Sequence, residues 1–175
     1  FANVGTEGCR SNGVAWKPVG QTELQLYFVF GLPFVSVDSS GTVTALGILN
    51  SSVGRVSIAA GSSAIGLVDG IDGYYYDGTT FAQITDLDFQ SNPSHIAWQD
   101  FYFIVNSANT GRFYISAIGD VTSWSSLQFA TAEANPDDIR AVVSTENVLY
   151  MFGRETTEAY FNSGNIFFPF EVFPE

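Results

Sequence analysis

The chain has 175 residues, enough for one domain of ordinary size, and its 18 acidic and 6 basic residues give a net charge of −12. Hydrophobic residues make up 46%, aromatic residues 15% and charged residues only 14%, a balance that excludes a disordered chain and is typical of a β-rich protein. Lys17 is the only lysine and residues 56–111 contain no lysine or arginine, which excludes a surface that grips nucleic acid through phosphates.

Short apolar runs separated by Gly, Asp, Asn and Ser are typical of strands joined by tight turns. They predict strands, in chain order, at 24–30, 34–37, 43–49, 55–59, 64–68, 73–76, 80–84, 96–98, 101–105, 112–118, 139–143, 148–152 and 158–161. Only 127–134 has a weak helical spacing. Asp38 and Asp77–Gly78 supply hairpin turns, because Asp and Gly tolerate left-handed backbone. The sequence predicts an all-β fold.

A repeat organises the second half of the chain. Residues 92–96 read Asn-Pro-Ser-His-Ile and residues 135–139 read Asn-Pro-Asp-Asp-Ile, an offset of 43 positions. Each copy follows a Phe-containing strand and precedes an apolar pair of strands. Degenerate copies are expected near Ile65 and Leu26. A unit of about 40–50 residues with four short strands has the size of one β-propeller blade.

The predicted architecture is therefore a β-propeller, or a partial propeller, built from repeated antiparallel blades of about 40–50 residues. One blade cannot bury both of its faces, so blades stack around an axis with aromatic side chains between them. The chain holds about four blades, and most propellers need more to close. Residues 1–25 form an N-terminal segment of uncertain fold, and residues 26–175 form blades that we expect to be part of a longer propeller.

Residues suited to nucleophilic or zinc chemistry are scarce. His95 is the only histidine and lies in the repeat, where the second copy has Asp138, so a structural turn position is the favoured interpretation. Cys9 is the only cysteine, has no base near it in sequence and cannot form an internal disulfide. One His and one Cys cannot make a four-ligand zinc site. We predict no catalytic, cofactor-binding or metal-binding residue, and no apolar run long enough for a membrane partner.

Carboxylates leave two alternatives open. Calcium takes six to eight oxygens, and five aspartates crowd the segment 69–88, although turn residues are the simpler interpretation: Asp69, Asp72, Asp77, Asp86 and Asp88. A glycoside hydrolase needs two carboxylates across a bond, and the candidates are Asp100, Glu133, Glu155 and Glu158. The aromatic run 74–76 fits sugar stacking or strand core, and core is favoured.

Uncommon strings in a fixed order give the chain a family resemblance. They are GRVS at 54–57, DG at 77–78, FAQITD at 81–86, GRFYISA at 111–117, TSW at 122–124, LQFATAE at 127–133, NPD at 135–137, LYMFG at 149–153, TTE at 156–158 and NSG at 162–164. Together they resemble the packaged-DNA-stabilisation proteins of short-tailed phages, also called tail accessory or tail hub proteins. The resemblance covers about residues 32–170.

The resemblance implies a structural β-propeller of the virion tail with no enzymatic activity. It implies a hexameric ring below the portal-and-adaptor assembly, with tail needle or spike proteins as distal partners. In that position the ring helps to retain the packaged genome and conducts it at ejection. DNA passes through the lumen of the ring without sequence-specific binding. The family transfers no catalytic or contact residue. The alternative class is a carbohydrate-binding or glycoside-hydrolysing β-propeller.

The acidic composition suits a conduit for DNA, because a negative wall repels phosphate and lets the duplex slide. We therefore expect the lumen of such a ring to be acidic. A lumen lined by the arginines of the second half would contradict this hypothesis: Arg112, Arg140 and Arg154.

Overall fold

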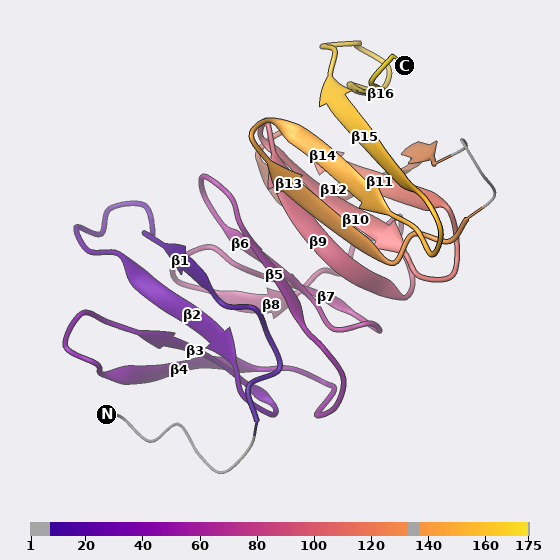
Figure 1. The fold of residues 1–175 in the computed structure, drawn as a ribbon. Helices are drawn as coiled ribbons and strands as arrows, with labels where there is room; N and C mark the ends of the chain where they lie inside the picture. The colour runs from indigo at the N-terminus through magenta and orange to yellow at the C-terminus, as the bar shows by residue number, and fades with distance from the viewer. Residues whose placement is uncertain (1–7, 133–136, 175) are drawn as a thin grey trace.

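The computed structural model describes residues 8–132 and 137–174. Within them the regular structure is entirely β and forms four antiparallel sheets of four strands each (Figure 1). Blades 1 and 2 contain β1 (Val14–Trp16), β2 (Gln25–Val29), β3 (Pro33–Val37), β4 (Val43–Ile48), β5 (Ser57–Ala60), β6 (Ile65–Val68), β7 (Gly73–Tyr76) and β8 (Phe81–Gln83). Blades 3 and 4 contain β9 (Pro93–Gln99), β10 (Tyr102–Ser107), β11 (Arg112–Ala117), β12 (Asp120–Thr131), β13 (Ala141–Thr145), β14 (Val148–Phe152), β15 (Thr157–Asn162) and β16 (Phe170–Val172).

Each blade is a meander in which consecutive strands pair. The first strands of the blades, β1, β5, β9 and β13, lie side by side as inner strands around a common axis (Figure 1). Neighbouring inner strands run in the same direction: Asn12 bonds the backbone of Ile58 at one end of β1 and β5, and Trp16 Nε1 donates to Gly61 O at the other. The predicted β-propeller architecture is confirmed.

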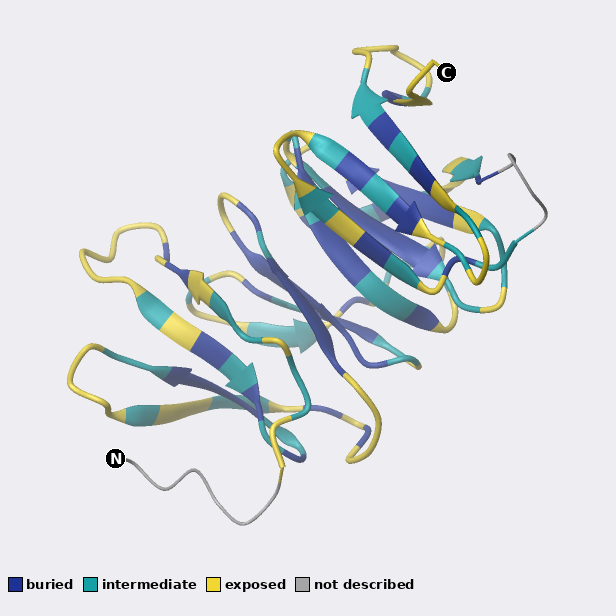
Figure 2. Ribbon diagram, viewed as in Figure 1, coloured by how far each residue is buried: buried dark blue, intermediate teal, exposed yellow. Residues whose placement is uncertain are grey.

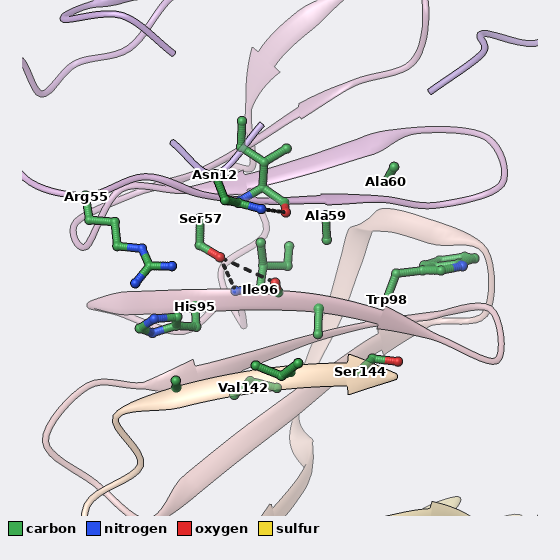
Figure 3. A pocket seen from close by; sticks show the side chains of 14 residues that line it. Asn12, Arg55, Ser57, Ala59, Ala60, His95, Ile96, Trp98, Val142 and Ser144 are labelled. Atoms are coloured by element: carbon green, nitrogen blue, oxygen red, sulfur yellow. Dashed lines mark hydrogen bonds between the residues drawn. The ribbon is translucent and has the colours of Figure 1, made fainter. Parts of the chain in front are cut away.

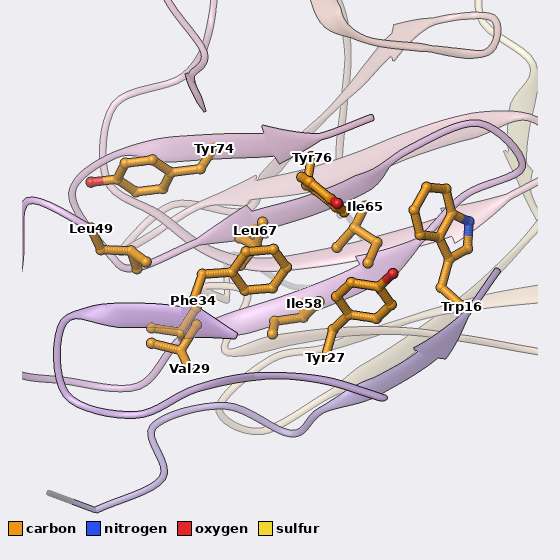
Figure 4. Close-up of a cluster of buried hydrophobic side chains, with 11 residues drawn as sticks. Trp16, Tyr27, Val29, Phe34, Leu49, Ile58, Ile65, Leu67, Tyr74 and Tyr76 are labelled. Atoms are coloured by element: carbon orange, nitrogen blue, oxygen red, sulfur yellow. The ribbon is translucent and has the colours of Figure 1, made fainter. Parts of the chain in front are cut away.

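The core consists of layers between adjacent blades. Figure 4 shows the layer between blades 1 and 2, where aromatic rings from both sheets meet. Tyr27 and Phe34 stack with ring centroids 5.8 Å apart, and Phe34 meets Phe81 of blade 2 at 5.2 Å. Such rings fill the wedge between splayed sheets, and each aromatic pair contributes about 1 kcal/mol beyond its buried area. The layer between blades 2 and 3 and the layer between blades 3 and 4 are built in the same way.

Glycines allow the closest approach between blades 2 and 3. A Cβ on Gly66 would lie 2.7 Å from Ile96 Cδ1 and 3.1 Å from two ring carbons of Phe103. A Cβ on Gly61 would lie 2.7 Å from the tip of the same ring. The ring of Phe103 is 1% exposed, so it has nowhere to move. Gly61 and Gly66 of blade 2 therefore leave the space that the ring of Phe103 in blade 3 occupies.

Aspartates organise the turns, as the sequence predicts for Asp38 and Asp77. Asp38 Oδ1 accepts hydrogen bonds from Ser40 and Thr42, and Asp77 Oδ1 accepts from the amides of Thr79 and Thr80. These bonds hold the pKa of both carboxyls below the ordinary value, because they stabilise the charged form. Each turn is thus stabilised by hydrogen bonds to a carboxylate.

Asp137 makes the same kind of contact between two turns. Its Oδ2 accepts from the amides of Glu155 at 2.7 Å and Thr156 at 3.0 Å. The Glu155 amide is the main reason that the pKa of Asp137 falls to about 2. Since this folded-state pKa lies below the ordinary 3.8, the stabilisation is complete above about pH 4 and is lost as the pH falls from about 4 to 2.

We expect Asp137→Asn to lower the melting temperature at pH 7 and to flatten its fall between pH 4 and pH 2. The amide side chain keeps its oxygen but loses the charge that titrates in this range. Circular dichroism melts of both proteins from pH 2 to pH 7 measure the two slopes. Asp138→Asn is the matched control, because it makes the same chemical change at the next position, where the carboxylate lies 3.7 Å from the partly exposed guanidinium of Arg140, and it should lower the melting temperature at pH 7 less than Asp137→Asn does. Equal acid slopes for wild type and Asp137→Asn would contradict this assignment.

The structure differs from the sequence prediction in the expected helix and in the register of the repeat. The helical spacing at 127–134 is misleading: β12 runs to Thr131 and pairs with β11, so the helix is wrong up to that point, and 133–136 lie outside the described residues. Ile65 and Leu26 lie in the second strands of blades 2 and 1, whereas Ile96 lies in the first strand of blade 3. The degenerate repeat copies therefore match each other, but they are shifted by one strand from the Asn-Pro copy.

Candidate functional site

A shallow groove of about 360 Å³ lies against the inner strands near the axis (Figure 3). Its floor comes from β5, β9 and β13, and its middle is lined by small side chains such as Ala59, Ala97 and Ala141. Arg55 and His95 stand together at one end of it, and Trp98 stands at the other (Figure 3). The small residues follow from the geometry, because inner strands converge on the axis and leave little room.

Polar side chains in the groove form hydrogen bonds that link neighbouring inner strands. Ser57 Oγ accepts from Ile96 N at 3.2 Å and faces Ile96 O at 3.4 Å. Ser144 Oγ donates to the side chain of Gln99 at 3.0 Å. Adjacent inner strands do not share a β-ladder, so these side chains satisfy backbone and amide groups that would otherwise be buried without partners. The hydroxyls of the groove are structural links between blades.

His95 lies in β9 and not in a turn, which corrects the sequence interpretation. Its Nδ1 lies 3.1 Å from Ser94 Oγ, and Asn106 Oδ1 accepts from the His95 amide at 2.8 Å. Partial burial is the main cause that lowers the pKa of His95, and the positive charge of Arg55 adds to it. A neutral imidazole beside one exposed guanidinium offers a weakly basic surface at this end of the groove.

A second hollow, of about 670 Å³, lies between blades 3 and 4 at the opposite end of the sheets. It is bordered by the β9–β10 turn, the β11–β12 turn and the loop before β16, with exposed Phe101, Ile118 and Ile166 at these positions. Asp100 and Phe101 both have positive φ, 49° and 70°, and Gly119 N donates to Phe101 O at 2.7 Å. A phenylalanine in this backbone region is strained and is held there by the neighbouring turn.

The two ends of the molecule differ in charge. All five arginines lie at the end where the inner strands begin, which we call the arginine end: Arg10, Arg55, Arg112, Arg140 and Arg154. The turns and adjoining strand ends at the opposite end carry Lys17 and six carboxylates: Glu23, Asp38, Asp77, Asp100, Asp120 and Glu146. The opposite end, which we call the acidic end, therefore has an excess of negative charge and no arginine, whereas the arginine end carries charges of both signs. The net charge of −12 does not reveal this uneven distribution of charge between the two ends.

Arg10 is the polar residue that sequence analysis missed. Its guanidinium donates to the carbonyls of Gly31, Ser51, Val53 and Gly54 at 2.5–2.8 Å and so fixes the loop that leads from blade 1 to blade 2. Ser51 Oγ, which also accepts from Arg10, donates in turn to buried Asp69 at 2.5 Å. Every residue has a backbone carbonyl, so the partners of Arg10 cannot be recognised from residue types. The sequence therefore gives no signal for the role of Arg10.

The five aspartates between 69 and 88 are not brought together. Asp77 lies at the opposite end from the rest, and Asp69 accepts from the amides of Ile71 and Asp72 within its own turn. Asp86 accepts from the amide of Trp124 at 2.9 Å. Within residues 8–132 and 137–174 no group of three or more His, Cys, Asp or Glu side chains is arranged to hold a metal ion.

The candidate carboxylates for glycoside hydrolysis are also separated. Asp100 lies at the acidic end, whereas Glu155 and Glu158 lie at the arginine end. Glu158 is buried and accepts from Tyr160 Oη at 2.8 Å, and Glu133 lies outside the described residues. The run 74–76 is strand core, since Tyr74 and Tyr76 pack between blades 1 and 2. Among the described residues, no helix has the length and apolar character to cross a membrane.

Solved structures with the same fold include natural and designed proteins. The computationally designed Ika4 protein superposes with a TM-score of 0.62 at 11% identity over 90% of this chain and 92% of that one. A humanized Polycomb Repressive Complex 2 from Chaetomium thermophilum gives 0.65 at 9% identity over 93% of this chain and 40% of that one. BamB from Moraxella catarrhalis gives 0.57 at 14% identity over 85% and 42%. Identities this low establish only the fold.

Comparison with protein families gives a more specific result. No curated protein sequence matches the chain. A phage stabilisation family, described as bacteriophage P22 Gp10, β-propeller, matches residues 2–174, nearly the whole chain. The description of the matched family as a β-propeller agrees with the four antiparallel blades, and the match spans the residues that carry the resemblance seen in the sequence. The chain therefore belongs to the phage stabilisation family of β-propeller proteins typified by bacteriophage P22 Gp10.

Proposed function

We propose that the chain is a structural component of the virion tail of a short-tailed phage and acts without catalysis. The single observation that carries this proposal is the family match over residues 2–174. The groove near the axis supports a structural role, because the hydroxyls of Ser57 and Ser144 form hydrogen bonds between blades. Rigid, repeated blades provide the large protein contacts that a tail assembly needs.

Six copies form a ring below the portal-and-adaptor proteins and above the needle or spike proteins in this proposal. The ring retains the packaged genome and conducts DNA at ejection. The acidic end supports this role, since Glu23, Asp38, Asp77, Asp100, Asp120 and Glu146 repel phosphate in a conduit. With this orientation Arg112, Arg140 and Arg154 lie at the arginine end, away from the acidic turns.

The proposal is tested with phage particles assembled with and without this protein. We expect particles lacking it to package DNA and then lose it, measured as nuclease-sensitive DNA after packaging. We also expect sixfold averages from electron microscopy of tails that contain it. Retention of DNA at the wild-type level without the protein would contradict the proposed role. Binding of the purified chain to a glycan array would instead favour the carbohydrate alternative.

A further inference from the structure

The hollow between blades 3 and 4 has walls that the strands of these two blades hold in place. The β9–β10 turn, the β11–β12 turn and the loop between β15 and β16 border it, and residues 163–167 of this loop are exposed (Figure 2). Its volume of about 670 Å³ lies within the range of roughly 300–1,000 Å³ that is typical of ligand pockets. The lining residues that the structure describes all lie in blades 3 and 4, so these two blades form the hollow.

Phe101 lies at the hollow in a backbone conformation that a phenylalanine rarely adopts. Its φ is 70° and its side chain is 60% exposed, with the ring meeting Trp98 edge-on at 6.2 Å. The equivalent two-residue turn of blade 4 has Asn147 at this position, and asparagine tolerates positive φ. A strained backbone that presents an exposed aromatic ring is typical of a binding site, because packing in the core does not require that ring.

The polar side chains that line the hollow are largely engaged within the fold. Trp124 Nε1 donates to a backbone carbonyl at 2.7 Å, and Ser116 Oγ donates to another at 2.8 Å. The side-chain oxygens of Asn162 and Asn165 accept from amides of their own loop at 2.9 and 3.0 Å. A sugar would need several such groups as hydrogen-bond partners, so their engagement favours an apolar occupant.

The charge at the hollow is negative. Asp100 is the only charged residue among the described lining residues. Asp120 lies close by in sequence to the β11–β12 turn, at the start of β12, and Glu171 accepts from Asn165 Nδ2 at 3.2 Å. Lys17, the only lysine of the chain, belongs to the loop that follows β1 in blade 1. An apolar hollow with carboxylates at its edge is complementary to an apolar side chain flanked by positive charges.

We propose that this hollow binds a short segment of a partner polypeptide that inserts one or two apolar side chains and carries Lys or Arg on either side of them. Phe101 packs on the inserted side chain, as exposed aromatic anchors do at protein interfaces. Asp100 pairs with a flanking cation and contributes to orientation and specificity more than to affinity. The inference rests on the hollow and on Phe101, and it does not depend on the proposed tail role.

Peptide binding by the purified chain tests the proposal. The probe is the fluorescently labelled peptide Lys-Lys-Leu-Phe-Lys-Lys, and we expect saturable binding with a Kd below about 1 mM, as the burial of two apolar side chains provides. Glu in place of every Lys should weaken binding at least about 3-fold at low salt, and high salt should reduce this difference. Ser-Ser in place of Leu-Phe should abolish binding. The absence of saturable binding of the first peptide at about 1 mM would overturn the inference.

Phe101→Gly separates a binding role of this ring from a structural one. Glycine adopts positive φ without strain, so the melting temperature should stay within about 3 °C of wild type or rise, while peptide binding weakens at least about 10-fold. Asn147→Gly is the matched control, because it makes a similar change in the equivalent turn of blade 4 and should leave binding unchanged. Asp100→Asn keeps a residue that tolerates positive φ and should reduce the preference for the lysine peptide over the glutamate peptide.

Other occupants of the hollow give different results with the same variant. Peptide binding that Phe101→Gly leaves unchanged would overturn the inference, since the peptide would then bind elsewhere. A melting temperature more than about 3 °C lower would also overturn it, because the ring would then support the fold. Glycan binding or self-association of the chain that Phe101→Gly abolishes would assign the hollow to a sugar or to a second copy. A glycan array and light scattering measure these two outcomes.

Discussion

Gly66→Val is expected to lower the free energy of unfolding by about 2–3 kcal/mol, among the largest effects of any single substitution. The added carbons enter the space that Phe103 and Ile96 occupy, 2.7–3.1 Å from where the Cβ would lie. Both side chains are buried between blades 2 and 3 and cannot move into solvent. Urea denaturation measures the change as a lower midpoint with an unchanged slope.

A double variant tests whether the effect of substituting Gly66 is steric. Ile96→Val removes the Cδ1 atom that lies nearest to the new Cβ, so Gly66→Ala combined with Ile96→Val should lose less stability than the sum of the two single changes. Gly8→Ala is the matched control, because no atom lies within 4 Å of a Cβ at that position. Strict additivity in the double variant would contradict the proposed contact.

Arg10→Ala is expected to cost about 2–4 kcal/mol, since hydrogen bonds from a charged donor contribute about 1.5–3 kcal/mol each and are not additive. The substitution leaves the carbonyls of Ser51 and Gly31, both partly buried, without their donor. A chain of this size should then melt roughly 5–15 °C lower. Scanning calorimetry measures the shift.

Two further variants separate the geometry of Arg10 from its charge. Arg10→Lys keeps the positive charge but cannot reach four carbonyls with one ammonium group, so it should lose most of the same stability. Arg55→Ala removes an exposed guanidinium at the same end and should change the melting temperature by less than about 2 °C. A lysine variant as stable as wild type would show that charge alone matters at position 10.

The architecture could be predicted from the sequence because its signals are local. Period-2 apolar runs and turn residues mark most strands, and Gly41 and Gly78 have the positive φ that the predicted turns require. The first copy of the Asn-Pro repeat marks the start of the inner strand of blade 3, since β9 begins at Pro93. Asn135 and Pro136 of the second copy lie outside the described residues, and β13 begins at Ala141. The clearest turn signals and the repeat together indicate antiparallel blades.

Other elements could not be predicted because their cause is tertiary. The turn between β9 and β10 places Asp100 and Phe101 at positive φ, where a glycine or asparagine would have been the recognisable signal. The long strand β12 is irregular in its pairing with β11, and its bulges disturb the period-2 pattern that identifies strands. β1 is only three residues long and depends on Trp16 packing against blade 2.

The candidate site was less accessible to sequence analysis than the fold. Which residues line the axis depends on how four blades converge, and no sequence pattern reports that convergence. His95 lies on the groove because β9 is an inner strand, whereas the repeat alone indicated a turn. The segregation of arginines to one end also depends on strand direction, which alternates along the chain.

The consecutive order of strands within each blade has a consequence for biosynthesis. Every described sheet is completed by four neighbouring strands, so its pairing needs no contact with a distant part of the chain. Structures rich in local contacts close short loops first and fold quickly. A nascent chain emerges from the ribosome more slowly than a hairpin forms, so each blade can pair its strands before the next blade is translated. The strand order therefore leads us to expect that blades form one after another from the N-terminal side, each packing on the apolar face of the blade before it.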